Sequence, residues 1–149
     1  MEMIRWATEV GRGLGSDGPF VCLIGELGAG KSTLVRAVCE GAGVAGAVLS
    51  PTFTLVHRHD RPGGGPLFHA DLYRLEDEEQ LWDVGWTELA SALSPVFVEW
   101  PERASAHLPA HRWEIRLRIP SARAERTERR HISIAKVGSP PPLTPLPEA

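Results

Sequence analysis

The sequence predicts an α/β fold of three layers, built on a mixed sheet with a parallel centre and antiparallel C-terminal strands. Residues 20–25, FVCLIG, form a continuous apolar run, which is typical of a central strand buried on both faces. Glycines interrupt the run, and from Lys31 the apolar side chains repeat at helical spacing. Residues 112–119, RWEIRLRI, alternate apolar with charged side chains, which indicates a half-solvated antiparallel strand. Strand, glycine loop, helix and later alternating strands together indicate this fold class.

The chain begins with a predicted amphipathic helix over residues 3–14, which ends at Asp17-Gly18-Pro19. Its apolar positions fall at helical spacing: Ile4, Ala7, Val10 and Leu14. The second helix begins at Lys31, and Gly41 or Gly43 is placed to end it.

The middle of the chain predicts a hairpin, then two short helices and a strand. Residues 50–60 and 67–75 are rich in Thr, Val, Phe and Leu, and they flank a Gly/Pro turn at 62–66 that we expect to be flexible and dispensable. Residues 76–90 start acidic, which favours a helix N-terminus, and Gly85 is expected to split them into two short helices. Residues 94–100, SPVFVEW, form a second short apolar strand that ends in a carboxylate.

The C-terminal part predicts one antiparallel pair and a tail. Residues 112–119 are expected to pair with residues 128–135. Residues 138–149 are Pro-rich and lack periodicity, so we expect a largely disordered end. The remaining residues 1–137 are expected to form a single domain, because a chain of 149 residues supplies one substantial core and little more.

Composition argues against several classes of protein. Hydrophobic content of 42% and charged content of 23% are ordinary for a globular chain, and no apolar run approaches the roughly 20 residues that a membrane helix needs. The N-terminus resembles neither a secretory signal nor a transit peptide, so we expect a cytoplasmic protein. Cys22 and Cys39 lie far apart among apolar residues, which favours reduced, partly buried thiols. A net charge of −3 argues against a dedicated nucleic-acid binder.

The glycine-rich segment carries the strongest functional signal. Gly25, Gly30, Lys31 and Ser32 satisfy the pattern G-x-x-x-x-G-K-[ST] of a phosphate-binding loop (P-loop), between a predicted strand and a predicted helix. Glycines let the backbone N–H groups turn around the phosphates, and the helix N-terminus directs its positive end at them. Lys31 adds a mobile cation, and the Ser32 hydroxyl suits Mg²⁺. The loop residues expected around the phosphates are Glu26, Leu27, Gly28, Ala29 and Gly30.

Two carboxylates are candidates for holding Mg²⁺ and orienting water, which a P-loop requires of its neighbours. Asp71 follows the apolar run LFHA and Glu99 follows PVFV, so each is expected at the C-terminal end of a strand, where open α/β sheets bind ligands. Thr52 and Thr54 are placed to supply a hydroxyl to a loop that senses the γ-phosphate. Taken alone, these two threonines are better explained by simple β-propensity.

Four segments resemble one known family in their order and spacing: GELGAGKSTLVRAV, SPTFTLV, HADLYRL and VEWPER. They are similar to the bacterial TsaE (YjeE) family of small P-loop ATPases, over about residues 4–134. We therefore expect a three-layer P-loop NTPase fold. The resemblance implies an ATPase that binds ATP and Mg²⁺ and works with the TsaB and TsaD proteins to make threonylcarbamoyladenosine beside the anticodon of tRNA. In that family TsaD transfers the threonylcarbamoyl group, and the ATPase supports repeated turnover.

The resemblance also implies roles for single residues. The residues expected at the phosphates and the metal are Lys31 at the β- and γ-phosphates, Ser32 and Glu99 on Mg²⁺, Thr33 as a second hydroxyl, and Asp71 at the γ-phosphate. Further matching positions are the switch-like Ser50, Pro51 and Thr52, the aromatic Trp100, and three nucleotide contacts, Glu102, Arg103 and, near the adenine, Thr8.

Two other classes of nucleotide-binding protein stay open. A small-molecule kinase uses the same loop but needs an acceptor-binding segment and a lid with arginines, and little sequence is left for either. Arg74 and Arg103 are the only arginines near the motifs, and neither is an obvious activating residue, so we expect slow hydrolysis by the isolated protein. A GTP switch needs a guanine-binding segment that resembles Asn-Lys-x-Asp. Lys31 and Lys136 are the only lysines, and neither lies in such a segment, so this class is disfavoured.

Two clusters have weaker functional interpretations. Residues 111–131 hold seven arginines against three glutamates and could contact tRNA phosphates, although a solvated strand face explains them better. His57, His59 and His69 are spaced so that a metal site is conceivable. Without a thiolate or a clear fourth ligand, ordinary strand-face histidines are the better interpretation.

Overall fold

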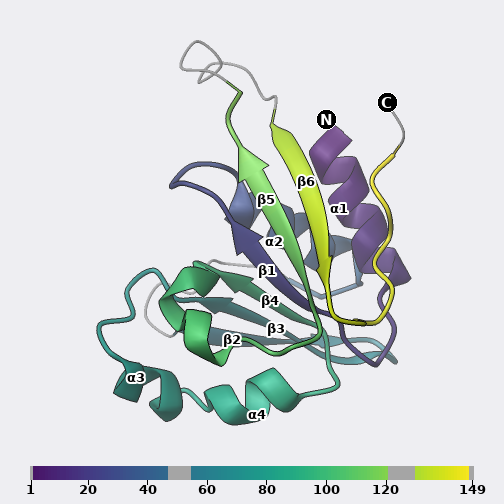
Figure 1. Cartoon of the computed structure of the whole chain (residues 1–149). Coiled ribbons are helices and arrows are strands. Elements are labelled where there is room, and N and C mark those ends of the chain that lie inside the picture. The colour runs from purple at the N-terminus through teal and green to yellow at the C-terminus, as the bar shows by residue number, and fades with distance from the viewer. Residues whose placement is uncertain (1, 47–54, 121–129, 148–149) are drawn as a thin grey trace.

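The computed structural model describes residues 2–46, 55–120 and 130–147, and it contains one six-stranded sheet in the order β2-β3-β4-β1-β5-β6 (Figure 1). The strands are β1 (Phe20–Ile24), β2 (Val56–Arg61), β3 (Gly65–Asp71), β4 (Val96–Glu99), β5 (Arg112–Arg118) and β6 (His131–Val137). The helices are α1 (Glu2–Gly13), α2 (Lys31–Gly41), α3 (Glu78–Asp83), α4 (Trp86–Ser91) and the 3₁₀ segment η1 (Pro101–His107).

The sheet is mixed in the way the sequence predicts. β1 lies between β4 and β5 and pairs with both in parallel, and β3 pairs with β4 in parallel. The two edges are antiparallel, β2 with β3 and β5 with β6. The predicted C-terminal pair is confirmed, with its second strand at His131–Val137 where residues 128–135 were predicted; Arg118 lies opposite His131 and Arg112 opposite Val137. β5 is therefore antiparallel to only one of its neighbours, which the alternating pattern alone does not reveal.

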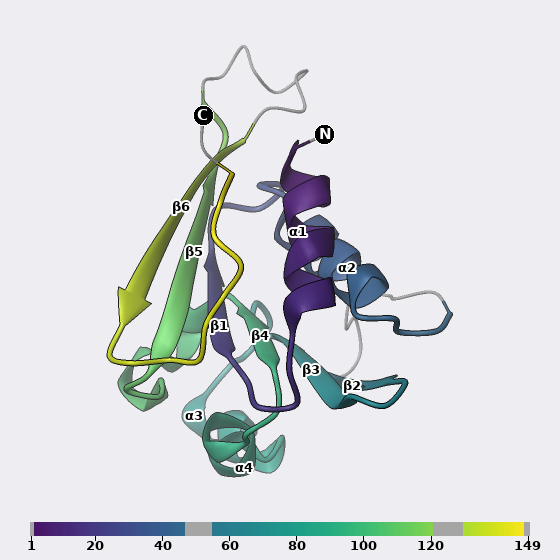
Figure 2. The ribbon, with the colours of Figure 1, turned by 90° about the vertical axis from the view of Figure 1, so that its right-hand side faces the viewer.

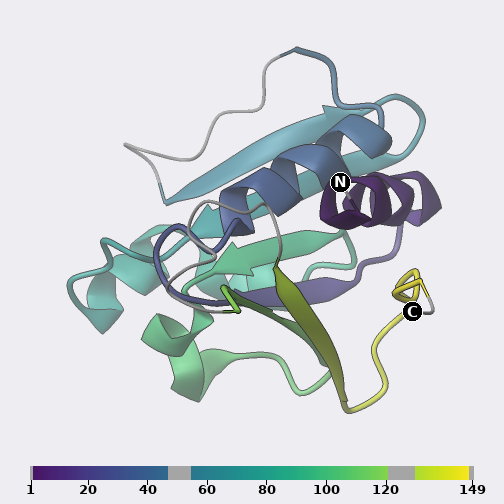
Figure 3. The ribbon, with the colours of Figure 1, turned by 90° about the horizontal axis from the view of Figure 1, so that it is seen from above.

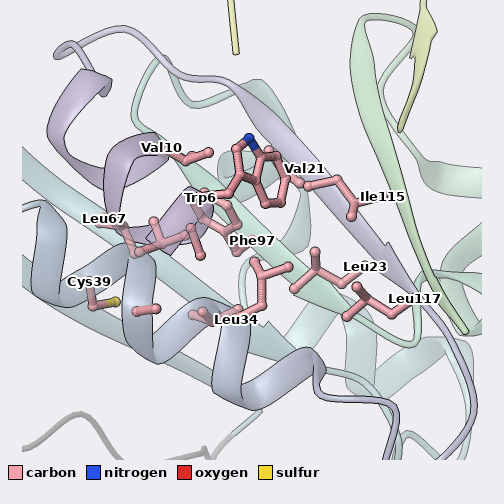
Figure 4. Close-up of a cluster of buried hydrophobic side chains, with 14 of the residues drawn as sticks. Trp6, Val10, Val21, Leu23, Leu34, Cys39, Leu67, Phe97, Ile115 and Leu117 are labelled. Atoms are coloured by element: carbon pink, nitrogen blue, oxygen red, sulfur yellow. The ribbon is translucent and has the colours of Figure 1, made fainter. Parts of the chain in front are cut away.

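Helices cover both faces of the sheet, which gives the predicted three layers (Figures 1 and 2). α1 and α2 lie side by side on one face, and α3, α4 and η1 lie on the other (Figure 3). Alternate residues of β1 serve the two cores, since Leu23 packs toward α1 and α2 while Cys22 packs toward α3 and α4. Figure 4 shows Leu23, Leu34 and Phe97 in the first of these cores. β1 is thus buried on both faces, as its unbroken apolar run predicts.

The helices begin and end where glycines and short polar residues permit. Asp77 accepts a hydrogen bond from the backbone N–H of Gln80 at 2.9 Å and so caps α3. Gly85 adopts a φ of +78° between α3 and α4, which confirms the predicted split. The segment η1 was not predicted, because its sequence carries no helical periodicity. Among the described residues, none of the helices has the length and apolar character needed to span a bilayer.

Both cysteines are buried free thiols. Burial raises the pKa of each thiol to about 12. Such thiols stay protonated at neutral pH and are poor nucleophiles, so Cys22 and Cys39 have packing roles, as their apolar neighbours in the sequence predict.

The hairpin turn after β2 is more firmly held than its Gly/Pro composition predicts. Arg61 is only 7% exposed, and its guanidinium donates to the carbonyl oxygens of Gly64 and Gly65 at 2.6 and 3.1 Å. It also donates to the carbonyl oxygen of Gly15 at 3.0 Å, in the loop between α1 and β1. A buried guanidinium that bonds several carbonyls ties the turn to the body of the protein. The turn is therefore a structural connection.

The segment after β6 also differs from the prediction of a disordered end. Residues 138–147 run beside α1 (Figure 2), where the indole N–H of Trp6 donates to the carbonyl oxygens of Thr144 and Pro145, each at 3.1 Å. Leu143 and Leu146 pack against the core under α1. The sequence does not predict this packing, because the segment contacts α1 through backbone carbonyls and isolated leucines and forms no periodic helix or strand. Residues 148–149 lie outside the described part of the chain.

Candidate nucleotide site

A pocket of about 240 Å³ opens at the edge of the sheet where β1, β3 and β4 end. Its lining residues come from the loop after β1, the start of α2 and the ends of β3 and β4: Leu27, Gly28, Gly30, Lys31, Ser32, Thr33, Asp71, Tyr73, Glu99 and Trp100. β4 pairs in parallel with both β1 and β3, so the carboxyl ends of all three strands meet at one edge of the sheet.

Three glycines determine the shape of the glycine loop, two through their backbone conformation and one through the space that it leaves. Gly28 and Gly30 have φ values of +83° and +105°, in the left-handed region that side chains disfavour. Gly25 is needed for space, since a Cβ there would lie 2.6 Å from the carbonyl oxygen of Leu117 on β5. Arg130 braces the loop from outside by donating through Nε to the carbonyl oxygen of Ala29 at 3.0 Å.

Lys31 is the cation of the pocket, and it is only 4% exposed. Its ammonium donates to the carbonyl oxygen of Gly25 and lies 3.4 Å from the centre of the Trp100 ring, a cation–π contact. Burial lowers the pKa of Lys31, against the opposing effect of the carboxylates of Glu99, Glu102 and Asp71. The ammonium is thus poorly solvated and held inside the pocket, where a phosphate would give it a stronger partner.

Ser32 and Glu99 place a hydroxyl and a carboxylate together. The Ser32 hydroxyl lies 3.0 and 3.1 Å from the two carboxylate oxygens of Glu99, which is 3% exposed at the end of β4. A hydroxyl and a carboxylate are oxygen donors of the kind that Mg²⁺ prefers, and here they stand beside a helix N-terminus suited to phosphates. The donor set therefore fits a magnesium nucleotide.

Asp71 lies beside this pair, because it is the register partner of Glu99 across β3 and β4. Its Oδ1 accepts a hydrogen bond from the backbone N–H of Tyr73 at 3.0 Å. Burial raises the pKa of Asp71, and the charge of Glu99 adds to the rise, while the Tyr73 hydrogen bond and the charge of Lys31 oppose it. Ionised Asp71 is therefore less favourable in the folded protein than in water.

This cost predicts that Asp71→Asn stabilises the free protein at pH 7. Asparagine keeps the Oδ1 acceptor for Tyr73 and removes the charge. The folded-state pKa is raised, so the cost of the charge is present above that pKa and disappears as pH falls toward 3.8, the ordinary value. The melting temperature of the variant should exceed that of the wild type at pH 7, and the difference should shrink on acidification. A constant difference across pH would show that charge is not its cause.

The structure brings most of the predicted site residues together, but not all of them. Glu26 is exposed and Ala29 is buried behind the loop, so neither side chain lines the pocket. Thr8 does not reach the pocket, because its hydroxyl donates to the carbonyl oxygen of Ile4 and its own carbonyl faces Gly41. Gly41 lies ten residues along α2 from the phosphate end, roughly 15 Å away at 1.5 Å per residue.

The predicted contacts after Trp100 do not line the pocket either. Glu102 and Arg103 are exposed on η1, and neither lines the site. Arg103 instead borders a second hollow between η1 and α3. The switch-like residues Ser50, Pro51, Thr52 and Thr54 lie outside the described residues, so their predicted roles stay predictions.

The two weaker clusters have ordinary surroundings where they are described. Arg112 and Arg116 both pair with Glu114, at 3.0 and 3.6 Å, which offsets part of the positive charge on β5. The rings of His57 and His59 lie 6.2 Å apart on β2. Across residues 2–46, 55–120 and 130–147, no group of three His, Cys, Asp or Glu side chains is arranged to hold a metal ion.

Sequence reasoning missed the roles of Tyr73 and His69. The Tyr73 ring lies 5.0 Å from that of Trp100 at the rim of the pocket, and His69 contacts Glu99 from inside the sheet. The sequence does contain one indication for His69: alternate residues of a strand lie on the same face, so His69 lies on the face of Asp71. That relation becomes informative only once β3 is known to pair with β4.

A glycine loop at the start of α2, a buried lysine and two strand-end carboxylates define a class, the P-loop nucleotide-binding proteins. The sequence model of the family described as threonylcarbamoyl adenosine biosynthesis protein TsaE matches residues 1–131. This chain belongs to the TsaE family, and the family predicted from its four segments is confirmed.

Known relatives agree with this membership. The TsaE protein of Streptomyces coelicolor is 41% identical over 126 residues, which cover 81% of this chain and 82% of the relative. The TsaE protein of Treponema pallidum is 38% identical over 115 residues, which cover 77% and 83%. A crystal structure of Bacillus subtilis YdiB matches with a TM-score of 0.69 and 26% identity, covering 92% of this chain and 80% of that one. The predicted fold class is likewise confirmed.

Proposed function

We propose that this chain is the ATP-binding and ATP-hydrolysing member of the machinery that makes threonylcarbamoyladenosine in tRNA, acting in the cytoplasm with TsaB and TsaD. The relatives are named as tRNA threonylcarbamoyladenosine biosynthesis proteins. The observation that carries the proposal is the pocket that gathers Lys31, Ser32, Asp71 and Glu99 at the N-terminus of α2. These are the residue types that phosphates, a magnesium ion and an attacking water require.

Each of these side chains would have a distinct task. The glycine loop and Lys31 would bind the β- and γ-phosphates, with Thr33 adding a hydroxyl. Ser32 and Glu99 would hold Mg²⁺, which when bound offsets the negative charge that develops on the phosphates. Asp71, next to Glu99, would orient the water that attacks the γ-phosphate.

Hydrolysis by the isolated protein should be slow. Among the described residues that line the pocket, the cation is Lys31, which is already required at the phosphates. An activating arginine is often worth a factor of about 10³–10⁵ in P-loop enzymes, and it can come from a partner. We therefore propose that TsaB and TsaD complete the site, and that hydrolysis supports repeated turnover of their complex.

The proposal is tested by measuring phosphate release from ATP by the protein alone and with TsaB and TsaD. The wild type should be slow alone and faster in the complex. Glu99→Ala should remove the stimulated rate, while Glu79→Ala, which changes an exposed glutamate on α3, should retain it. If the partners leave the rate unchanged, the proposed role in the complex is wrong, and a small phosphoryl acceptor becomes the alternative to screen for.

A further inference from the structure

We propose that His69 is a positioning residue that fixes the carboxylate of Glu99 for Mg²⁺. This inference rests on the proposed function, because it takes Glu99 to be a metal ligand. It goes further by assigning to a histidine inside the sheet the orientation of that ligand.

His69 lies deep in the structure and has one polar partner of note. It is 1% exposed in the middle of β3, and its Nε2 lies 2.5 Å from Oε2 of Glu99, itself 3% exposed. Burying an imidazole in a sheet costs free energy unless its polar atoms are bonded. A core position of this kind is normally filled by an aliphatic side chain, as Leu67 fills the position two residues earlier. The contact with Glu99 offsets part of that cost.

The protonation pattern of the ring follows from its two surroundings. With Glu99 as a carboxylate, Nε2 carries the hydrogen and donates it to Oε2. His69 Nδ1 is buried and has no hydrogen-bond partner among the described residues. An Nδ1–H would leave a buried donor unpaired, so the tautomer with the hydrogen on Nε2 leaves the smaller penalty. The ring is therefore set up as a donor to Glu99.

The second neighbour of Glu99 cannot fix the carboxylate in the same way. The Ser32 hydroxyl lies at nearly equal distances from the two oxygens, 3.0 Å from Oε1 and 3.1 Å from Oε2. It therefore favours neither oxygen. The hydrogen bond of His69 is to Oε2, and it comes from β3, so it holds one named oxygen of the carboxylate in place.

Partners of metal ligands have measurable effects on metal affinity. Removing such a hydrogen bond typically costs about 10–100-fold in metal affinity or activity. A rotated Glu99 would still be an anion in the pocket, so the loss should concern Mg²⁺ and not the phosphates themselves. The inference therefore predicts a change in the magnesium requirement without a change in metal-free nucleotide binding.

The test uses calorimetric titration of the full chain with the non-hydrolysable analogue AMP-PNP, in EDTA and over a range of Mg²⁺ concentrations. His69→Leu should raise the Mg²⁺ concentration for half-maximal binding about 10–100-fold and leave affinity in EDTA within about twofold of wild type. His69→Gln should keep the Mg²⁺ concentration for half-maximal binding near the wild-type value, because the glutamine amide nitrogen reaches about as far as Nε2. His69→Asn should not, because its amide nitrogen ends near the position of Nδ1. His57→Leu, on the facing strand, is the matched control.

The outcomes separate this inference from the proposed function. A wild type that binds AMP-PNP equally well with EDTA and Mg²⁺, or a Glu99→Ala variant with an unchanged magnesium requirement, would overturn both. If wild type and Glu99→Ala behave as proposed but His69→Leu keeps the normal requirement, only the role of His69 is wrong. Equal losses in EDTA and Mg²⁺ without rescue by Gln would reduce His69 to a structural residue. If the leucine variant does not fold, the contrast between Gln and Asn decides.

Discussion

Replacing Lys31 with alanine should weaken ATP binding by roughly 30-fold or more. The ammonium is buried in the pocket at the start of α2, and alanine would leave a bound phosphate without this cation. Removing one partner of a buried charge pair costs about 2–5 kcal/mol, which is roughly 30-fold or more in affinity. The measurement is calorimetric or fluorescence titration with ATP and Mg²⁺.

The same substitution should not unfold the protein, which distinguishes a binding defect from a stability defect. Folding lowers the pKa of Lys31, so the charged ammonium is less favourable in the folded state than in water. For a base with a lowered pKa, this cost is present at every pH below the folded-state pKa and is lost above 10.5, the ordinary value. At pH 7, removing the charge removes a cost. The lost contact with the Trp100 ring offsets part of that gain.

The chain supplies its own control for Lys31. Lys136 is the only other lysine, and it lies exposed on β6 with its ammonium 5.9 Å from the Trp113 ring. Lys136→Ala should keep wild-type affinity for ATP. If Lys31→Ala and Lys136→Ala bind ATP equally well, the loop does not hold the phosphates in the way proposed.

The parts of the site that were predictable are those encoded by adjacent residues. Gly30, Lys31 and Ser32 follow one another in the chain, so the loop and the helix that begins in it are local properties. Asp71 and Glu99 are 28 positions apart, and their meeting follows from a general property of parallel strands, whose carboxyl ends share one edge. The prediction of both carboxylates therefore needed only the correct strand ends.

Prediction from sequence is limited where the position of a residue depends on how whole elements cross. Thr8 lies on a correctly predicted helix, and because α1 crosses α2 near the C-terminal end of α2, Thr8 does not line the phosphate pocket. Its contact near the adenine stays a prediction. Helical periodicity predicts which face of a helix is buried, but it does not predict where along a neighbouring helix that face makes contact. The segment 138–147 shows the same limit, since its contacts with Trp6 depend on α1 lying beside it. His69 needed the pairing of β3 with β4.

The crossing of α1 and α2 leads to the largest expected effect on stability. A Cβ added at Gly11 would lie 2.0 Å from the carbonyl oxygen of Val38, and a Cβ at Gly41 would lie 2.0 Å from the carbonyl oxygen of Thr8. Each helix thus uses a glycine to let the backbone of the other approach. Both clashes involve backbone atoms, which cannot rotate away as a side chain can.

Gly11→Ala should therefore lower the free energy of unfolding by at least about 3 kcal/mol, near the upper end for inserting a group into a packed core. Helix propensity favours the opposite sign, because alanine within a helix is about 0.5–1 kcal/mol better than glycine. The 2.0 Å approach decides the matter, since only separation of the two helices relieves it. Urea unfolding followed by circular dichroism measures the change.

Gly15→Ala is the matched control, because the nearest atom to its Cβ would be 3.9 Å away. That variant should stay within about 0.5 kcal/mol of the wild type. Since α2 carries Lys31 and Ser32 at its first turn, any Gly11→Ala protein that remains folded must shift α2 or α1, and its affinity for ATP should fall as well. A Gly11→Ala protein with wild-type stability would mean that the two helices are farther apart than this structure places them. The glycine contact therefore links the packing of the α1–α2 layer to the position of the phosphate loop.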